Sequence, residues 1–252
     1  MDGAKQLNWD IYFQRKSNHH LNKYIAKYKG KETEKLIKKW LTNINQAKVL
    51  KTDAYEEVFL YDSFIKNISN ITIIDISKVA IKKAKKNFPD KKFEVSNICN
   101  LPFKNNCFEY IISTSTLDNI PMKRMKIALK EMYRVLKSKG YLLITIDNKN
   151  NFLYYLFYNL NKILKFIPYY QDRCYSLYEI TKLLNFYGFK IKKIDYIVHI
   201  IPPSNFIINI LDKLNKNIAK ILAEFLINIA EFISKKPIKS LTGWFIAILA
   251  EK

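Results

Sequence analysis

The stretch ITIIDISKVAIKKAKKNF, residues 71–88, decides the fold of this chain. Residues 71–77 are rich in isoleucine, as a buried strand is, and the acidic Asp75 stands near their end. The segment 79–88 that follows places its apolar side chains on one face of a helix, namely Val79, Ala80, Ala84 and Phe88. A buried strand followed directly by an amphipathic helix predicts a parallel βαβ unit, with the helix packed against the sheet.

The same alternation of strands and helices continues on both sides of this stretch. Strands are predicted at 48–52, 71–77, 92–97, 108–116, 141–147, 189–200 and 241–252. Helices are predicted around residues 9–13 and at 32–41, 79–88, 122–136 and 178–187. A further helical segment is predicted between the first strand and about residue 67, and one long helical period covers 204–234. We therefore expect an α/β fold with a doubly wound, seven-stranded, mostly parallel sheet, in which a helical insertion precedes an antiparallel last strand.

The composition is that of a globular protein. Of the 252 residues, 49% are hydrophobic and 26% are charged, which excludes a disordered tail, a collagen-like repeat and a coiled-coil rod. The three cysteines have neither CxxC nor zinc-site spacing, so we expect reduced thiols, no metal and a cytoplasmic location. The N-terminus is polar and no uncharged apolar run reaches 18 residues, so neither a signal peptide nor a membrane span is expected.

The net charge of +21 leaves more than one partner open. Lys and Arg together number 43, but Arg occurs only at Arg15, Arg124, Arg134 and Arg173. Because Arg is the residue that grips phosphate with two hydrogen bonds and stacks on bases, we expect the lysines to serve solubility and nucleic-acid binding to be unlikely. RNA or an anionic membrane surface is the alternative partner for this charge.

Asp75 lies where an open parallel sheet binds its ligands, at the carboxyl end of a strand. A carboxylate at that place accepts hydrogen bonds from the two hydroxyls of a ribose. An Asp at the end of a strand is also a common helix N-cap. Its position alone therefore leaves a ligand-binding role and a capping role open.

Four segments together resemble a known enzyme family. They are ITIIDISKVAIKKAKKNF (71–88), VSNICNLPFKNNCFEYIIS (95–113), STSTLDNIP (113–121) and ALKEMYRVLKSKGYLLITI (128–146). In this order and spacing they are similar to the motifs of class I S-adenosylmethionine-dependent methyltransferases, of the type that includes ubiquinone and menaquinone methylases. The resemblance implies a Rossmann-like methyltransferase sheet and S-adenosylmethionine as the cofactor.

The resemblance also assigns roles to single residues. Asp75 takes the place of the ribose-binding acid, and Ile76 would lie along the adenine. Asn97 stands where the family has an Asp that accepts the adenine amino group, and Ile98 would offer its backbone N–H to the ring. Ser113 would lie beneath the methionine part of the cofactor, facing the substrate.

The first motif of the family is altered in this chain. The family has a strand ending in an acid and then G-x-G-x-G, whereas this chain has VLKTDAYEEVF at 49–59, without a glycine. Lys51, Thr52 and Asp53 complete the predicted cofactor-binding set: Asp53 would bind the cationic amino group of the cofactor, and Lys51 its carboxylate. A rearranged loop that works and a loop that no longer binds cofactor both fit this sequence.

The resemblance divides the chain, as a single domain, into five segments. They are an N-terminal helical cap (1–47), a cofactor-binding half (48–147), a substrate-side half (148–200), a helical insertion (201–238) and a terminal strand (239–252). Aromatic side chains of the third segment line either a substrate pocket or the ordinary core: Tyr154, Tyr155, Phe157, Tyr158, Phe166, Tyr169 and Tyr170. The helix predicted over 206–233 packs on its own domain or makes a peripheral membrane contact.

Three functions remain open at this point. The first is methylation of a small, apolar, aromatic or lipid-like molecule, and the second is a methyltransferase-like binding protein without catalysis. The third is RNA methylation, but the N/D-P-P-Y/F motif typical of such enzymes does not follow the fourth strand. No catalytic residue is assigned, although His19, His20, Asp118 and His199 are candidates for a base. The substrate and the oligomeric state do not follow from the sequence.

Overall fold

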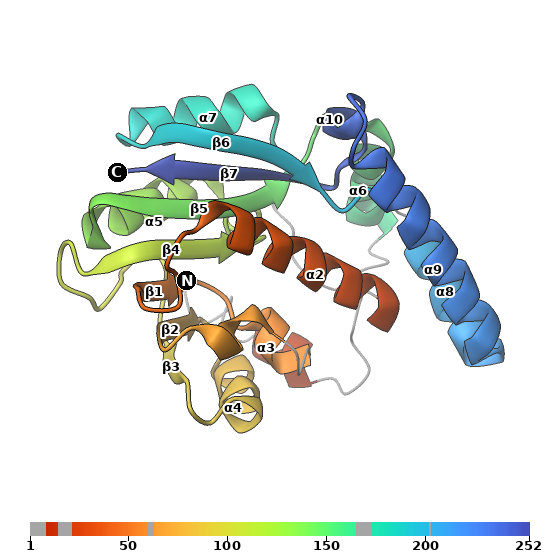
Figure 1. Ribbon diagram of the computed structural model, residues 1–252, viewed down its shortest axis with the longest axis horizontal. Helices are drawn as coiled ribbons and strands as arrows, with labels where there is room; N and C mark the ends of the chain where they lie inside the picture. The colour runs from red at the N-terminus through yellow and green to blue at the C-terminus, as the bar shows by residue number, and fades with distance from the viewer. Residues whose placement is uncertain (1–8, 15–21, 60–62, 165–172, 202) are drawn as a thin grey trace.

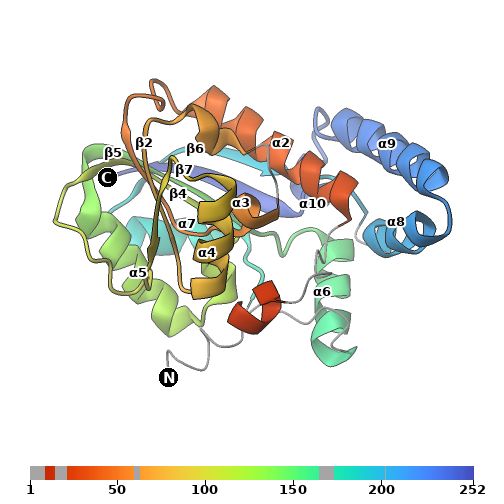
Figure 2. The same cartoon turned by 90° about the horizontal axis from the view of Figure 1, so that it is seen from below.

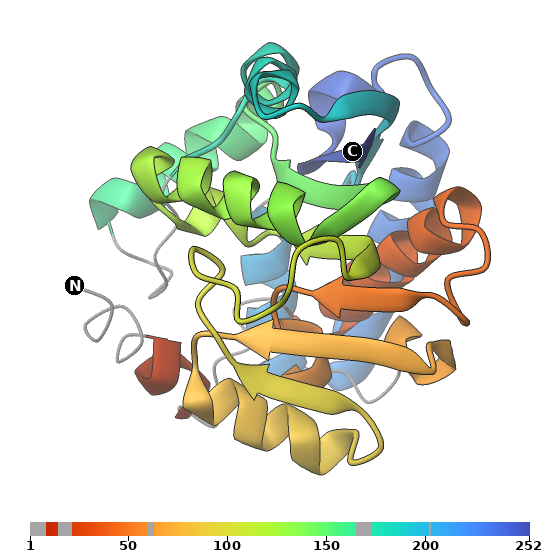
Figure 3. The same ribbon diagram turned by 90° about the vertical axis from the view of Figure 1, so that its left-hand side faces the viewer.

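The computed structural model describes residues 9–14, 22–59, 63–164, 173–201 and 203–252. Its centre is a seven-stranded sheet in the order β3-β2-β1-β4-β5-β7-β6. The strands are β1 (Lys48–Lys51), β2 (Asn70–Asp75), β3 (Lys92–Val95), β4 (Phe108–Thr114), β5 (Leu136–Asp147), β6 (Lys190–Ile197) and β7 (Phe245–Glu251). The pairs among β1 to β5 are all parallel, and β7 is antiparallel to both β5 and β6 (Figures 1 and 3). The predicted α/β fold class is confirmed.

Helices cover both faces of the sheet (Figures 1 and 2). They are α2 (Lys23–Trp40), α3 (Tyr55–Phe59), α4 (Lys78–Asn87), α5 (Met122–Val135), α6 (Phe152–Leu164), α7 (Leu177–Phe186), α8 (Pro203–Leu214), α9 (Lys216–Ile233) and α10 (Lys239–Thr242), with 3-10 turns η1 (Phe64–Asn67) and η2 (Leu117–Asn119). Residues 9–14 form a further helical segment. The sheet separates two hydrophobic cores, one with α2, α4, α8 and α9 and the other with α5 and α7.

The alternation of side chains along each strand builds these two cores. Val49 belongs to the core under α2 and α4, whereas Leu50, the next residue, belongs to the core under α5 and α7. Ile73 and Ile74 of β2 divide in the same way. Strands that are buried on both faces need apolar side chains at every position, which is why 71–74 carry no charge.

The structure corrects the predicted helix over 206–233. Asn215 divides it into α8 and α9, because its side chain accepts hydrogen bonds from the backbone N–H groups of Asn217 (3.0 Å) and Ile218 (3.2 Å). Asn favours this capping geometry over a helix interior. The two helices are therefore free to fold back on one another as a hairpin.

Three predicted boundaries also move. The helix predicted at 32–41 begins at Lys23, since Ile25, Ala26 and Tyr28 extend its buried face by more than two turns. β5 begins at Leu136 and β7 only at Phe245, after the short helix α10. These differences change the lengths of elements and leave the topology as expected.

Candidate functional site

The candidate site lies at the carboxyl ends of β1, β2, β4 and β5. In Figure 1 the arrows of β4 and β5 run toward the side of the molecule that carries α6, α8 and α9. Three of these strands end at a charged residue: Lys51 ends β1, Asp75 ends β2, and Asp147 ends β5. The parallel arrangement brings these strand ends to one edge of the sheet.

Asp75 is held in place by backbone N–H groups. Its Oδ2 accepts from Ala54 (3.0 Å) and its Oδ1 from Ser77 (2.8 Å). Burial raises the pKa of Asp75 to about 6, although these two hydrogen bonds favour the carboxylate. The N-cap of α4 is Ser77, whose side chain accepts from Ala80, so Asp75 is not itself the cap. Its half-buried carboxylate keeps further lone pairs for a ligand.

The predicted adenine-binding residues stand beside Asp75. β3 pairs with β2 so that Val95 lies opposite Asp75, and Asn97 and Ile98 follow in the next turn. The Asn97 side-chain oxygen accepts from the backbone of Cys99 (2.9 Å), which fixes that turn. Ile98 is buried and Ile76 is half-buried. The structure thus brings the four residues predicted for the adenosine part to two neighbouring strand ends.

The segment 9–14 lies over this edge. Asp10 accepts from Ser77 Oγ and from the backbone N–H of Val79 (3.1 Å) at the start of α4. The Phe13 ring lies 6.4 Å from the Tyr55 ring and 5.9 Å from the Phe59 ring, centroid to centroid. Residues 9–14 therefore pack against the start of α4 and against α3, beside the ends of β1 and β2.

Lys51, at the end of β1, is fully buried in a cluster of acids. Its Nζ lies 2.9 Å from Asp53 Oδ1 and 2.9 Å from Glu57 Oε2. Burial disfavours the ammonium, but the two carboxylates outweigh burial and raise the pKa of Lys51. Thr114 Oγ donates to the other oxygen of Asp53 (2.9 Å), and Ser63 Oγ to that of Glu57 (2.8 Å). In this state Lys51 and Asp53 neutralise one another, and their predicted contacts with a cofactor remain predictions.

The segment that replaces the glycine-rich loop needs no glycine. None of residues 51–59 has a positive φ, so ordinary side chains fit its backbone without strain. Ala54 is completely buried and donates its N–H to Asp75, after which the chain enters α3 directly. The backbone conformation of residues 51–59 therefore does not require glycine.

Three buried polar atoms at this edge have no hydrogen-bond partner among the described residues. They are Thr52 Oγ1, Glu56 Oε1 and Ser113 Oγ, which lie on the β1–α3 segment and at the end of β4. Burial raises the pKa of Glu56 to about 7, even though the charge of Lys51 opposes this. Unpartnered buried polar groups are rare in proteins and mark places where a water or ligand belongs. These residues fit the polar amino-acid part of S-adenosylmethionine, as Asp75 fits its ribose.

A buried pair of acids lies at the ends of β4 and β5. Asp118 Oδ2 accepts from the backbone N–H of Asp147 (3.1 Å), and Tyr154 donates its hydroxyl to Asp147 Oδ1 (2.8 Å). Burial raises the pKa of Asp118 to about 6, and burial together with the charge of Asp118 raises the pKa of Asp147 well above its usual value. The two carboxyls therefore share a proton near neutral pH.

Lys29 of α2 reaches over the same edge. Its Nζ lies 3.5 Å from Ser115 Oγ and 4.7 Å from the centre of the Phe245 ring. The positive charge of Lys29 opposes the rise in pKa of Glu56 and of the two acids of the pair, so it acts on all three. Ser115 itself has a positive φ of 48°, an unusual conformation that tends to occur at functional sites.

Sequence reasoning missed three of these residues: Lys29, Glu56 and Asp147. Asp147 could have been predicted from the sequence. Ligands bind at the carboxyl ends of parallel strands, and this rule, which identified Asp75 at the end of the second strand, applies equally to the fifth. The position of Lys29 depends on how α2 crosses the sheet, for which the sequence carries no local signal.

The other candidates for a base fall into two groups. His199 is buried, and its two ring nitrogens lie 2.9 Å from Thr242 Oγ1 and 3.0 Å from the Tyr196 carbonyl oxygen, as in a structural histidine. His19 and His20 lie outside the described residues, as do Phe166, Tyr169 and Tyr170. Within the described ranges, no cluster of His, Cys, Asp and Glu suits a metal ion.

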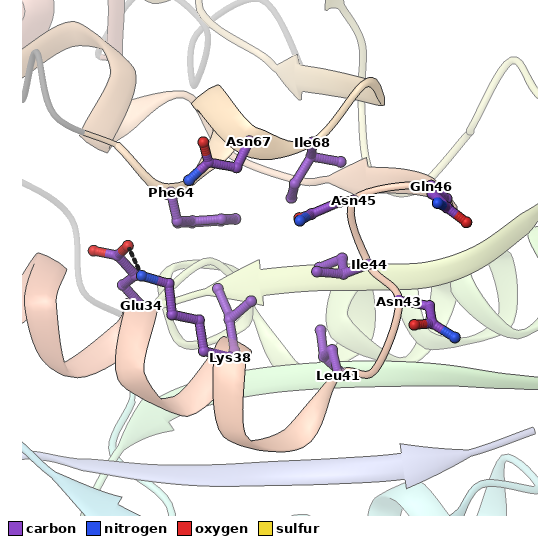
Figure 4. A pocket seen from close by; sticks show the side chains of 11 residues that line it. Glu34, Lys38, Leu41, Asn43, Ile44, Asn45, Gln46, Phe64, Asn67 and Ile68 are labelled. Atoms are coloured by element: carbon purple, nitrogen blue, oxygen red, sulfur yellow. Dashed lines mark ion pairs between the residues drawn. The ribbon is translucent and has the colours of Figure 1, made fainter.

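Two cavities lie at the opposite edge of the sheet. One, of about 340 Å³, is lined by residues of the end of α2, the loop before β1 and η1 (Figure 4). Its rim carries the ion pair between Glu34 and Lys38 (2.7 Å), and Phe64 and Ile68 form its apolar wall. The other, of about 350 Å³, lies beside Tyr110 and residues 137–141. Neither contains a residue predicted to bind the cofactor.

Comparison with known proteins agrees with this geometry. A family model described as a methyltransferase domain matches residues 57–144. The ubiquinone/menaquinone biosynthesis C-methyltransferase UbiE of Rickettsia bellii is 35% identical over 109 residues, which are 39% of this chain and 43% of that protein. Over these residues the chain is similar to class I S-adenosylmethionine-dependent methyltransferases.

Other relatives extend the likeness. An uncharacterised protein of Methanocaldococcus jannaschii, MJ1252, is 28% identical over 147 residues, which are 56% of this chain and 57% of that protein. A solved SAM-dependent methyltransferase of Thermotoga maritima has the same fold, with a TM-score of 0.65, 18% identity and coverage of 97% of this chain and 99% of that one. The chain thus aligns with less than half the length of the curated methyltransferase and with nearly all of the solved fold.

The matched residues begin after β1 and so leave out the altered first motif. They include Asp75, Ile76, Asn97, Ile98 and Ser113, and they exclude the three residues of the predicted set that follow β1. The methyltransferase signal therefore comes from the adenosine side of the site.

Proposed function

We propose that this protein transfers a methyl group from S-adenosylmethionine to a small, apolar or aromatic, lipid-like molecule. The observation that carries the proposal is the edge formed by β2 and β3, where Asp75 is fixed by two backbone N–H groups beside Asn97 and Ile98. A lipid-like acceptor is supported by those curated relatives that are named for ubiquinone and menaquinone biosynthesis.

When bound, the cofactor supplies a methyl group activated by a positively charged sulfur. Asp75 accepts hydrogen bonds from the ribose hydroxyls, and Ile76 and Ile98 pack against the adenine. Thr52, Glu56 and Ser113 satisfy their unpartnered polar atoms on the amino-acid part. Positioning of the two reactants provides most of the rate in such a displacement.

The Asp118–Asp147 pair accepts the proton that the methyl acceptor loses. The pair lies at the ends of β4 and β5, one carboxyl is ionised while its partner keeps a proton, and Tyr154 orients Asp147. A base with a pKa near the working pH is the most efficient proton acceptor. The positive charge of Lys29 stabilises the ionised form beside it.

Calorimetry with S-adenosylhomocysteine tests the cofactor site. The wild-type chain is expected to bind it with micromolar affinity, and Asp75→Ala is expected to weaken binding by roughly tenfold or more, since a charged hydrogen-bond acceptor is worth about 1.5–3 kcal/mol. Asp90→Ala, a change of an exposed acid in the loop after α4, is the matched control and is expected to bind as the wild type does. No detectable binding by the wild type would instead support the methyltransferase-like protein without catalysis.

A further inference from the structure

The hairpin of α8 and α9, residues 203–233, exposes an apolar surface. It stands at one side of the molecule beyond the end of the sheet (Figures 1 and 2). Nine of its large apolar side chains are between 39% and 78% exposed: Phe206, Ile207, Ile210, Leu214, Ile218, Ile221, Phe225, Ile229 and Phe232. Such a concentration of exposed apolar side chains marks an interaction surface.

The helix α9 has two apolar faces and buries only one of them. Its small residues Ala219, Ala223 and Ala230 are buried in the core. The exposed stripe repeats every three or four residues, through Ile218, Ile221, Phe225, Ile229 and Phe232, and so lies along one side of the helix. Because the first face already packs the helix on its own domain, the fold does not require the second face to be apolar.

Lysines lie in the chain before and after this apolar stripe. Residues 203–242 contain six lysines and three acidic residues. Each acid lies near a lysine: Asp212 is 3.0 Å from Lys23, Glu224 is 3.8 Å from Lys220, and Glu231 is 3.5 Å from Lys35. Four exposed lysines of the hairpin and its C-terminal flank make no ion pair within the described part of the chain: Lys213, Lys216, Lys235 and Lys236.

We propose that the hairpin binds the surface of a bilayer that contains anionic lipids, with α9 lying in the plane of the interface. Apolar side chains flanked by unpaired lysines are what such a surface recognises. None of the described helices is long and apolar enough to cross a membrane, so the contact lies along the surface. A second copy of the chain is a poorer occupant, because a net charge of +21 on each copy opposes their association.

The hairpin stands at the end of the sheet where the candidate site lies. β4 and β5 run toward it (Figure 1), and α9 packs against α2, the helix that carries Lys29. If the methyl acceptor is lipid-like, as the proposed function has it, a bilayer held against the hairpin presents that acceptor near the carboxyl edge. The membrane contact itself does not depend on that function.

Sedimentation with vesicles tests the contact. The full chain is expected to sediment with vesicles of phosphatidylcholine and phosphatidylglycerol at low salt, and much less with phosphatidylcholine alone. The double change Ile221→Ser and Phe225→Ser is expected to lower the partition coefficient by about tenfold or more, since it removes two side chains from the apolar stripe. Phe186→Ser on α7 is the matched control: Phe186 is 80% exposed, and its loss is expected to leave partitioning unchanged.

The charges are tested in the same way. Lys213→Glu with Lys216→Glu is expected to reduce binding to anionic vesicles by about tenfold or more, because each lysine near such a surface contributes about 1 kcal/mol. Lys85→Glu with Lys86→Glu on the exposed face of α4 is the control and should bind nearly as the wild type does, apart from a small loss due to net charge.

Three results would overturn the proposal. They are no sedimentation of the wild type with anionic vesicles, an equal loss in the α7 or α4 controls, and a wild-type dimer in light scattering that the Ile221→Ser and Phe225→Ser variant converts to a monomer. Binding of S-adenosylhomocysteine by the hairpin variants is expected to be unchanged. Vesicle binding and cofactor binding therefore succeed or fail separately.

Discussion

At the scale of single residues, Asp118 makes stability depend on pH. Its pKa is raised from 3.8 to about 6 by burial, so the folded chain holds this proton more tightly than the unfolded chain. Protonation of Asp118 therefore stabilises the folded chain fully below about pH 4, and this stabilisation is lost as the pH rises through about 6. Asp118→Asn cannot ionise. Between pH 4 and 7 the free energy of unfolding of the variant is therefore expected to rise relative to the wild type by about 2–3 kcal/mol.

Urea unfolding at a series of pH values measures this difference. Asp90→Asn is the control, because Lys91 keeps the pKa of the exposed Asp90 below its usual value. The control is expected to show almost no change relative to wild type over the same pH interval. A constant difference between Asp118→Asn and wild type from pH 4 to 7 would show that Asp118 is ionised throughout.

The sequence predicts those site residues whose place follows from one strand and its end. Asp75, Asn97 and Ser113 each end or follow a buried strand, so pattern and topology together bring them to one edge. Lys51 shows the limit of such reasoning. Its place at the end of β1 was predictable, but its enclosure by Asp53 and Glu57 depends on the path of a short helix that replaces the usual loop.

At the scale of elements, the boundary between α8 and α9 depends on one cap. Asn215 accepts from two backbone N–H groups of the first turn of α9. Asn215→Ala is expected to destabilise that turn by about 1 kcal/mol. Hydrogen exchange resolved by residue measures this as faster exchange at the start of α9. Asn217→Ala, an exposed change in the same turn, is the control, and equal acceleration in both variants would contradict the capping role.

The elements that the sequence predicts well are those buried on both faces. The apolar runs at 73–74 of β2, 110–112 of β4 and 141–144 of β5 lack the spacing of an amphipathic helix, and each strand ends at polar residues. The long helical period over 204–234 was harder to divide, because residues on both sides of Asn215 keep helical spacing. The Asn215 side chain ends one helix and caps the next, so the run forms a hairpin and not one long helix. This capping is seen only in the structure.

At the scale of the whole molecule, the strand order accounts for the position of the hairpin. β7 lies between β5 and β6 and runs against both, so the end of β6 at Ile197 lies opposite the start of β7 at Phe245, and any insertion between them stands at that end of the sheet. The helices α8, α9 and α10 make that connection beside α2. The exposed apolar side chains of α8 and α9 are thus placed by topology near the edge that carries the acids and Lys29.

Ligand binding at this edge is expected to stabilise the whole domain. A ligand that binds only the folded chain adds roughly 2.7 kcal/mol at a hundred times its Kd, which raises the Tm of a domain of this size by about 5–10 °C. S-adenosylhomocysteine is expected to raise the Tm more than adenosine at equal concentration, because only the former reaches Thr52, Glu56 and Ser113. Differential scanning fluorimetry with both ligands, and with homocysteine as a control, measures this. Equal shifts from the two nucleosides would mean that the Lys51 cluster keeps the amino-acid part of the site closed, so that this chain binds only the adenosine half of S-adenosylhomocysteine.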